Sequence, residues 1–130
     1  MTEQTLYDAV GGEPTFRRLV GDFYRRVRND PVLRPLYPED QLEAAEQRLL
    51  LFLVQYWGGP TTYSQTRGHP RLRRRHMPFR IGAAERDAWL ANMRAALDGI
   101  GLAPEYEQPV WDHLERAAYL MQNVADDAVR

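Results

Sequence analysis

Apolar residues recur at helical spacing along nearly the whole 130-residue chain, and no segment shows the sustained alternation of a strand. Four amphipathic stripes predict helices over residues 15–28, 42–56, 83–99 and 108 to about 124. From residue 49 onward the second helix is apolar nearly all round, which indicates that it is covered on two sides. The pattern predicts an all-α fold, and the length suits one domain spanning residues 1–130.

Helix-ending signals separate these stripes and leave one long irregular segment. Pro14 lies near the start of the first helix, and Asn29, Asp30 and Pro31 end it. Gly58, Gly59 and Pro60 end the second helix. The following segment, residues 58–82, is longer than a plain helical bundle needs, and long irregular segments in compact domains are often functional.

The composition narrows the class of protein. The 17 arginines and 18 acidic residues give a formal charge of -1, so no global field attracts nucleic acid or an anionic membrane. Cysteine is absent, which excludes disulfides and thiolate metal sites and suits a reducing compartment. The longest apolar stretch, residues 49–57, is too short to span a bilayer, and the first residues do not resemble a signal peptide. We therefore expect a cytoplasmic protein that does not enter a membrane.

The sequence "HPRLRRRHMPF", residues 69–79, allows two interpretations of its second histidine. Pro70 and Pro78 predict a short helix with His76 in its last turn. His76 could be a solvated basic residue favoured by the helix dipole, or a single axial ligand of a metal group. A site with several histidine ligands is disfavoured, because the three histidines do not pair at helical spacing. The run from Arg71 to Arg75 also leaves open a helical module that binds nucleic acid.

Three aromatic residues with polar atoms belong to positions that face inward. Tyr24 lies on the inward stripe of the first helix, Tyr37 follows a short turn, and Trp89 lies on the inward face of the third. Buried tyrosine and tryptophan need partners for their O–H and N–H groups. They are either ordinary core residues bonded to backbone, or donors directed at a polar guest in one cavity.

Several motifs in fixed order resemble the group II truncated haemoglobins of bacteria, particularly those of actinobacteria. The resemblance runs from about Leu6 to Val124, and the motifs that carry it are "YDAVGG" (7–12), "FY" (23–24), "YPED" (37–40), "QYWGGP" (55–60), "RGHPRLRRRHMPFRI" (67–81) and "ERDAW" (85–89). It implies a truncated globin, with a two-on-two helical sandwich around haem b, a very short first helix and a loop in place of most of the proximal helix.

The resemblance also implies a role for each candidate residue. His76 is expected to be the proximal ligand of the haem iron, with its second ring nitrogen oriented by a backbone carbonyl such as that of Leu72. The expected distal residues are Tyr24, Tyr37 and Trp89, with Ala45 where many globins have a histidine and Leu49 one turn further. The remaining expected haem contacts are Phe23, Phe52, Leu53, Tyr63, Arg67, His69, Leu72, Arg73, Met77, Phe79, Ile81 and Met93, among which Tyr63, Arg67, His69 and Arg73 are candidate partners of the propionates.

The implied function is reversible binding of O2, and of CO or NO, with slow release, for oxygen storage, transport or oxygen-linked redox chemistry. An enzyme that consumes NO, or a peroxidase-like one, is the alternative, and it needs a separate reductase. No Asp or Glu lies in residues 67–81, so the anionic proximal partner that assists O–O cleavage is not supplied locally. A homodimer is compatible with the resemblance, and nucleic-acid binding through Arg71 to Arg75 is a remote alternative.

Overall fold

The computed structural model describes residues 4–68, 71, 75–77 and 79–124, and every regular element in this part of the chain is helical. The α-helices are α1 (Leu6–Ala9), α2 (Glu13–Arg28), α3 (Leu42–Tyr56), α4 (Thr62–Arg67), α6 (Ala83–Ile100) and α7 (Pro104–Met121), with short 3-10 turns at Arg34–Leu36 and Glu39–Gln41. The predicted all-α fold is confirmed. Among the described residues no helix is long and apolar enough to cross a membrane.

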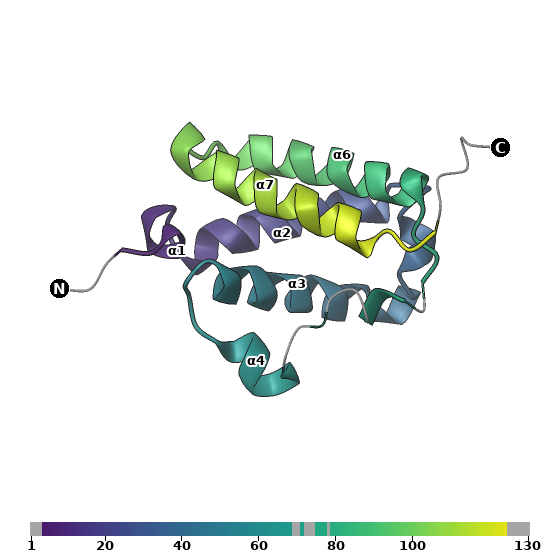
Figure 1. Ribbon diagram of the computed structural model, residues 1–130, viewed down its shortest axis with the longest axis horizontal. Coiled ribbons are helices and arrows are strands. Elements are labelled where there is room, and N and C mark those ends of the chain that lie inside the picture. The colour runs from purple at the N-terminus through teal and green to yellow at the C-terminus, as the bar shows by residue number, and fades with distance from the viewer. Residues whose placement is uncertain (1–3, 69–70, 72–74, 78, 125–130) are drawn as a thin grey trace.

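Helices α2, α3, α6 and α7 form two layers of two (Figure 1). Helix α2 packs against both α3 and α6, and α6 packs against α7. The core between them consists of fully buried apolar side chains from all four helices, including Phe23 and Val27 of α2, Leu53 of α3, Met93 and Leu97 of α6, and Val110 and Leu114 of α7. This arrangement is the expected two-on-two sandwich.

The ends of α1 and α3 are held together by a close backbone approach. The Tyr7 N–H donates to the Trp57 carbonyl at 3.0 Å. Gly58, at the end of α3, has φ +105, a conformation that favours glycine. A Cβ atom added to Gly59 would lie only 2.7 Å from the Val54 side chain and 2.8 Å from the Tyr7 ring, so this contact requires glycine. The very short first helix is thereby fixed to the rest of the fold.

Helix α7 begins earlier than its apolar stripe predicts. The expected start at Gln108 is wrong by four residues, because Pro104 stands at the first helical position, where proline suits a helix, and acidic residues follow in the first turn. Pro109 is accommodated inside the helix. At its other end α7 stops at Met121, and Asn123 leaves the helix to contact the loop that precedes α6.

Candidate functional site

A cavity of about 550 Å³ lies between α3, α6, α7 and the loop that carries His76. Its size falls in the range typical of sites for small molecules and cofactors, about 300–1,000 Å³. The wall is mainly apolar, and the apolar residues lining it include Leu33, Leu36, Ala45, Leu49, Phe52, Leu53, Phe79, Ile81, Leu114, Ala117, Ala118 and Met121. The other lining residues, nearly half of the set, carry polar groups, and they are Tyr24, Tyr37, Gln41, Arg48, Tyr63, Arg67, Arg75, His76, Glu85, Arg86, Trp89 and His113.

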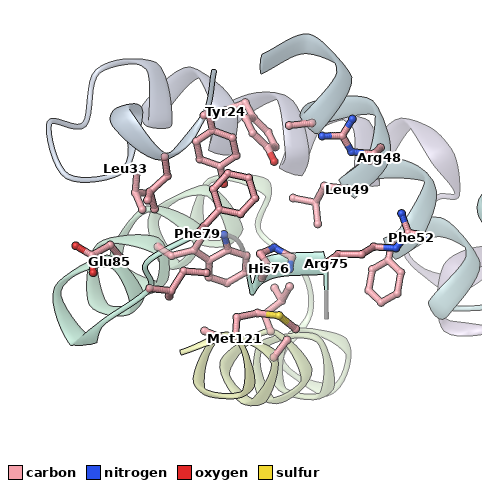
Figure 2. Close-up of a pocket in the computed structure, with 18 of the residues that line it drawn as sticks. Tyr24, Leu33, Arg48, Leu49, Phe52, Arg75, His76, Phe79, Glu85 and Met121 are labelled. Atoms are coloured by element: carbon pink, nitrogen blue, oxygen red, sulfur yellow. The ribbon is translucent and has the colours of Figure 1, made fainter. Parts of the chain in front are cut away.

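His76 lies in the middle of the cavity view, with Tyr24 on one side and Met121 of α7 on the other (Figure 2). It is half-buried and lies in a helical turn, and its carbonyl accepts a hydrogen bond from the Phe79 N–H at 3.0 Å. Neutral imidazole is a good ligand for iron. The described residues contain no group of three or more His, Cys, Asp or Glu that could hold a bare ion.

Asn123, which the sequence analysis did not single out, attaches the loop around His76 to the end of α7. Its side-chain N–H groups donate to the carbonyls of His76 at 3.2 Å and Phe79 at 2.7 Å, and its side-chain oxygen accepts from the Ile81 N–H at 2.9 Å. The Asn123 N–H also donates to the Ile81 carbonyl at 2.8 Å. One amide side chain thus fixes the backbone on both sides of residue 78.

Tyr24 and Tyr37 meet at the opposite wall. Their rings contact edge to face with centroids 5.6 Å apart, and their hydroxyl groups are joined by a hydrogen bond. Burial raises the pKa of Tyr24 well above its usual value, and the Tyr37 hydroxyl raises it further. Burial also raises the pKa of Tyr37. Both hydroxyls are therefore protonated at neutral pH, and the pair has one O–H proton more than its mutual hydrogen bond uses.

Trp89 presents the third polar aromatic group to the cavity. Its ring packs edge to face on Phe23, with centroids 5.2 Å apart, and Phe23 contacts Tyr24 in the same way at 5.1 Å. None of the described residues accepts a hydrogen bond from the Trp89 indole N–H. The structure thus brings Tyr24, Tyr37 and Trp89 to one cavity, as the sequence predicts.

A second residue that sequence reasoning missed joins the two sides of this wall. Asp30, just after α2, accepts from the N–H groups of Val32 at 2.8 Å and Leu33 at 3.0 Å. Its other oxygen accepts from the Asn92 amide of α6 at 2.8 Å, and this bond is the main reason that the pKa of Asp30 is lowered. The turn that leads to Tyr37 is therefore attached to the helix that carries Trp89.

Cationic groups lie at the edge of the cavity. Tyr63 is buried against Phe52, and the Arg67 guanidinium lies 5.9 Å from the Tyr63 ring. Arg75 lines the cavity and donates to the Arg67 carbonyl at 3.0 Å. Arg48 of α3, also missed from the sequence, lines the cavity near Tyr24 and has no carboxylate partner among the described residues (Figure 2).

Some expected contacts do not line the cavity. Phe23 and Met93 are fully buried in the core behind it, since both face the packing between α2 and α6. Met77 is 56% exposed and faces away. Three further expected contacts, His69, Leu72 and Arg73, lie outside the described residues. Ala45, Leu49, Phe52, Leu53, Tyr63, Arg67, Phe79 and Ile81 do line it.

His113 of α7 is a second histidine in the cavity wall, and the sequence analysis gave it no role. Its ring stacks on Tyr56 with centroids 3.7 Å apart, and its Nδ1 atom is buried without a hydrogen-bond partner. Burial lowers the pKa of His113, and the charge of Arg116 lowers it further. The sequence feature that could have identified His113 as a cavity residue is its helical spacing from apolar residues of α7, three residues after Val110 and four before Ala117.

The lining fits a large, flat, mostly apolar group that carries a metal and two carboxylates. One imidazole faces the cavity interior, apolar side chains form the walls, and Arg48, Arg67 and Arg75 lie where carboxylates could be neutralised. An iron porphyrin has these properties, and the surrounding side chains would hold it by burial and by one axial bond.

Comparisons with known proteins agree with this geometry. The model of the bacterial-like globin family matches residues 5–123. A thermostable haemoglobin from the actinobacterium Thermobifida fusca is 62% identical, with a TM-score of 0.91, over 93% of this chain and 98% of that chain. The chain is 43% identical to group 2 truncated haemoglobin YjbI of Bacillus subtilis, over 90% of this chain and 87% of that protein. A structure described as truncated oxygen-avid haemoglobin from Bacillus subtilis is 41% identical, covers 92% of this chain and 100% of its own, and has a TM-score of 0.85.

Proposed function

This chain belongs to the bacterial-like globins as a group II truncated haemoglobin, and from that premise we propose that it holds haem b through His76 and binds O2 with slow release. Membership of the family implies a haem-binding protein that takes a small gas ligand. The haem type, the identity of the iron ligand, the preference for O2, the single-domain organisation and a cytoplasmic location are parts of this proposal.

The position of His76 supports its assignment as the iron ligand. Two described histidines line the cavity, and His76 lies at the centre of the view in Figure 2, whereas His113 is stacked on Tyr56 with its Nδ1 atom buried. The haem supplies iron that binds diatomic ligands. The role of the loop is to hold the imidazole at one face of that iron, and the Asn123 hydrogen bonds fix the backbone that carries it.

The observation that carries slow release is the set of donors on the other wall. Tyr24, Tyr37 and Trp89 would stabilise the partial negative charge of an O2 ligand by hydrogen bonds directed into the cavity. The Tyr24 and Tyr37 hydroxyls share one hydrogen bond, so one O–H proton of the pair stays free for a ligand, and the Trp89 N–H has no acceptor among the described residues. Two such bonds at about 1.5 kcal/mol each would slow dissociation by roughly two orders of magnitude. A relative described as oxygen-avid supports the same reading.

Absorption spectroscopy of the purified protein tests this function. We expect a red protein whose ferrous form, made with dithionite, is five-coordinate and shifts on adding O2 or CO. The O2 dissociation rate is then measured by stopped flow, with CO replacing the released O2. A colourless protein that does not take up hemin, or ferrous haem that releases O2 as fast as a pocket without donors, would contradict the proposal.

An enzyme that consumes NO is the second candidate, and the same distal donors favour it because they would stabilise bound O2 until NO arrives. A peroxidase is less well supported, since no Asp or Glu lies in residues 67–81 to make the imidazole strongly anionic. Both enzymes need a source of electrons. Rapid loss of bound O2 on adding NO, with nitrate formed in equal amount, would favour the enzyme that consumes NO.

A further inference from the structure

The charges of this chain are divided sharply along its sequence. From Gln47 to Ala84 there is no Asp or Glu but there are seven arginines, which gives this stretch a formal charge of +7. The rest of the chain holds the other 10 of the 17 arginines and all 18 acidic residues, a formal charge of -8. The net charge of -1 therefore hides a strongly dipolar molecule.

Four of the arginines in this stretch are described as exposed, and they lie on or next to the segment that carries His76. We define the basic face as Arg67, Arg71, Arg75, Met77, Phe79 and Arg80, all of which are exposed. Hydrogen bonds join its members: Arg75 donates from its side chain to the Arg67 carbonyl and from its backbone to the Arg71 carbonyl. Arg67, Arg75 and Phe79 also line the cavity, so this face is the outer side of the site itself.

Two apolar side chains are exposed within this basic surrounding. Met77 is 56% exposed and Phe79 is 39% exposed. Apolar contacts surrounded by charged residues are typical of protein interfaces, whereas the phosphate backbone of duplex nucleic acid is bound mainly by charge. The negative remainder of the molecule would also repel a polyanion that extended beyond the face. A compact acidic protein suits these features better than nucleic acid.

The function proposed above indicates what such a partner would do, and this inference rests on that function. A globin whose iron has been oxidised must gain one electron before it binds O2 again. Cysteine is absent from these 130 residues, so no thiol or iron–sulfur centre of this stretch can supply the electron. We propose that the basic face docks an acidic one-electron donor protein, of the kind that carries a flavin or an iron–sulfur cluster.

The chemistry of this step is a transfer of one electron. The donor protein is oxidised by one electron, the ferric haem iron is reduced by one electron, and no covalent bond forms or breaks. Complementary charge raises the rate of encounter between the two proteins, by about 10-fold to 1,000-fold at low ionic strength. A small, transient interface is enough for such an exchange.

The test uses the haem-loaded protein and a plant-type [2Fe–2S] ferredoxin, which is strongly acidic, as the probe. Reduced ferredoxin is mixed with the ferric protein under CO, and the second-order rate constant of reduction is measured as NaCl is raised. We expect a steep fall with salt. The variant Arg71→Glu/Arg80→Glu, whose sites lie outside the cavity wall, should lower the low-salt rate constant about tenfold or more.

The matched control is Arg17→Glu/Arg18→Glu, which reverses two exposed arginines of α2 and changes the net charge equally. It should change the rate constant less than about twofold, since its charges lie away from the basic face. Equal slowing in both variants would mean that only net charge matters, and no slowing in the first variant would remove the face as a docking site. Either result overturns the proposal.

Binding is measured separately by titrating the ¹⁵N-labelled protein with oxidised ferredoxin and, in a second sample, with duplex DNA. Shifts concentrated at the basic face with ferredoxin support the proposal. Tighter binding of DNA, lost only in Arg71→Glu/Arg80→Glu, would replace the protein partner by nucleic acid. Because this measurement needs no electron transfer, it distinguishes failed docking from failure of the proposed haem function, which the absorption spectrum reports.

Discussion

The two walls of the cavity are built in different ways. The distal wall, which we define as Tyr24, Tyr37 and Trp89, comes from helices and a capped turn that pack on the buried Phe23. The proximal wall, which we define as Arg75, His76, Phe79 and Ile81, belongs to a partly exposed segment held by backbone hydrogen bonds and by Asn123. The distal wall owes its geometry to core packing, whereas the proximal wall owes it to a few directed bonds.

This difference suggests a division of function between the walls. Core packing holds side chains in fixed directions, which suits donors that must face a bound ligand. A loop held by a few bonds opens locally at lower cost than a core helix. We therefore expect substitutions in the distal wall to change ligand dissociation, and substitutions in the proximal wall to change retention of haem.

The largest effect is expected from removing the proposed iron ligand. His76→Ala should lose haem or bind it without the five-coordinate ferrous spectrum, and added imidazole should restore that spectrum in part, because it replaces the missing ring. His113→Phe is the control, since it keeps an aromatic ring against Tyr56 while removing the second cavity histidine. An unchanged ferrous spectrum in His76→Ala without imidazole would show that the assignment is wrong.

The next effect comes from the residue that fixes the proximal wall. Asn123→Ala removes three side-chain hydrogen bonds to the backbone around His76, which together contribute about 2–4 kcal/mol to holding the loop. Transfer of haem to an excess of a haem-scavenging protein should become faster by tenfold or more.

Asn92→Ala is the matched substitution for the distal side. It breaks the hydrogen bond from α6 to Asp30, which supports the distal wall from behind. It should speed O2 dissociation with little change in haem transfer, and Asn123→Ala should do the reverse. If both variants changed both rates alike, the two walls would not be independent.

Within the distal wall the donors should differ in strength. Trp89→Phe keeps an aromatic ring on Phe23 and deletes a donor that has no other acceptor among the described residues. O2 dissociation should accelerate about tenfold, which corresponds to about 1.4 kcal/mol. Tyr37→Phe and Tyr24→Phe should each have a smaller effect, since the remaining hydroxyl of the pair can turn to the ligand. Stopped-flow dissociation rates of the three variants check this order, and a largest effect from Tyr24→Phe would reverse it.

The smallest expected effect is the pH dependence of the free energy of unfolding, and it comes from His113 of α7. In the folded protein burial lowers the pKa of His113 below its ordinary value of 6.5. At pH values near and below 6.5 the unfolded chain therefore binds more protons than the folded protein, so the free energy of unfolding should decrease as the pH falls through this range. Urea unfolding of the haem-free protein should show this decrease, and His113→Phe should reduce it. The carboxyls with lowered pKa, Asp22 and Asp30, act at lower pH, near and below 3.8.

Helical periodicity was enough to predict the four long helices and to place Tyr24 and Trp89 on inward stripes. Periodicity left open whether they are core residues or donors in one cavity, and it was the resemblance to truncated haemoglobins that grouped them with Tyr37, beside which both now line the cavity. The role of Asn123 could not, because its bonds join residues 42 to 47 positions apart in a stretch without periodicity. Arg48 and His113 sit at the edges of amphipathic stripes, where sequence alone does not separate a cavity wall from a solvated surface.

Resonance Raman spectroscopy of the haem-loaded protein tests the division between the walls most directly, since it reports both sides of the iron. The ferrous protein should show an iron–histidine stretching band that Trp89→Phe and His113→Phe leave unchanged and His76→Ala abolishes. The C–O stretching band of the CO complex should shift in Trp89→Phe and stay in place in Asn123→Ala. Survival of the iron–histidine band in His76→Ala, with its loss in His113→Phe, would contradict the account.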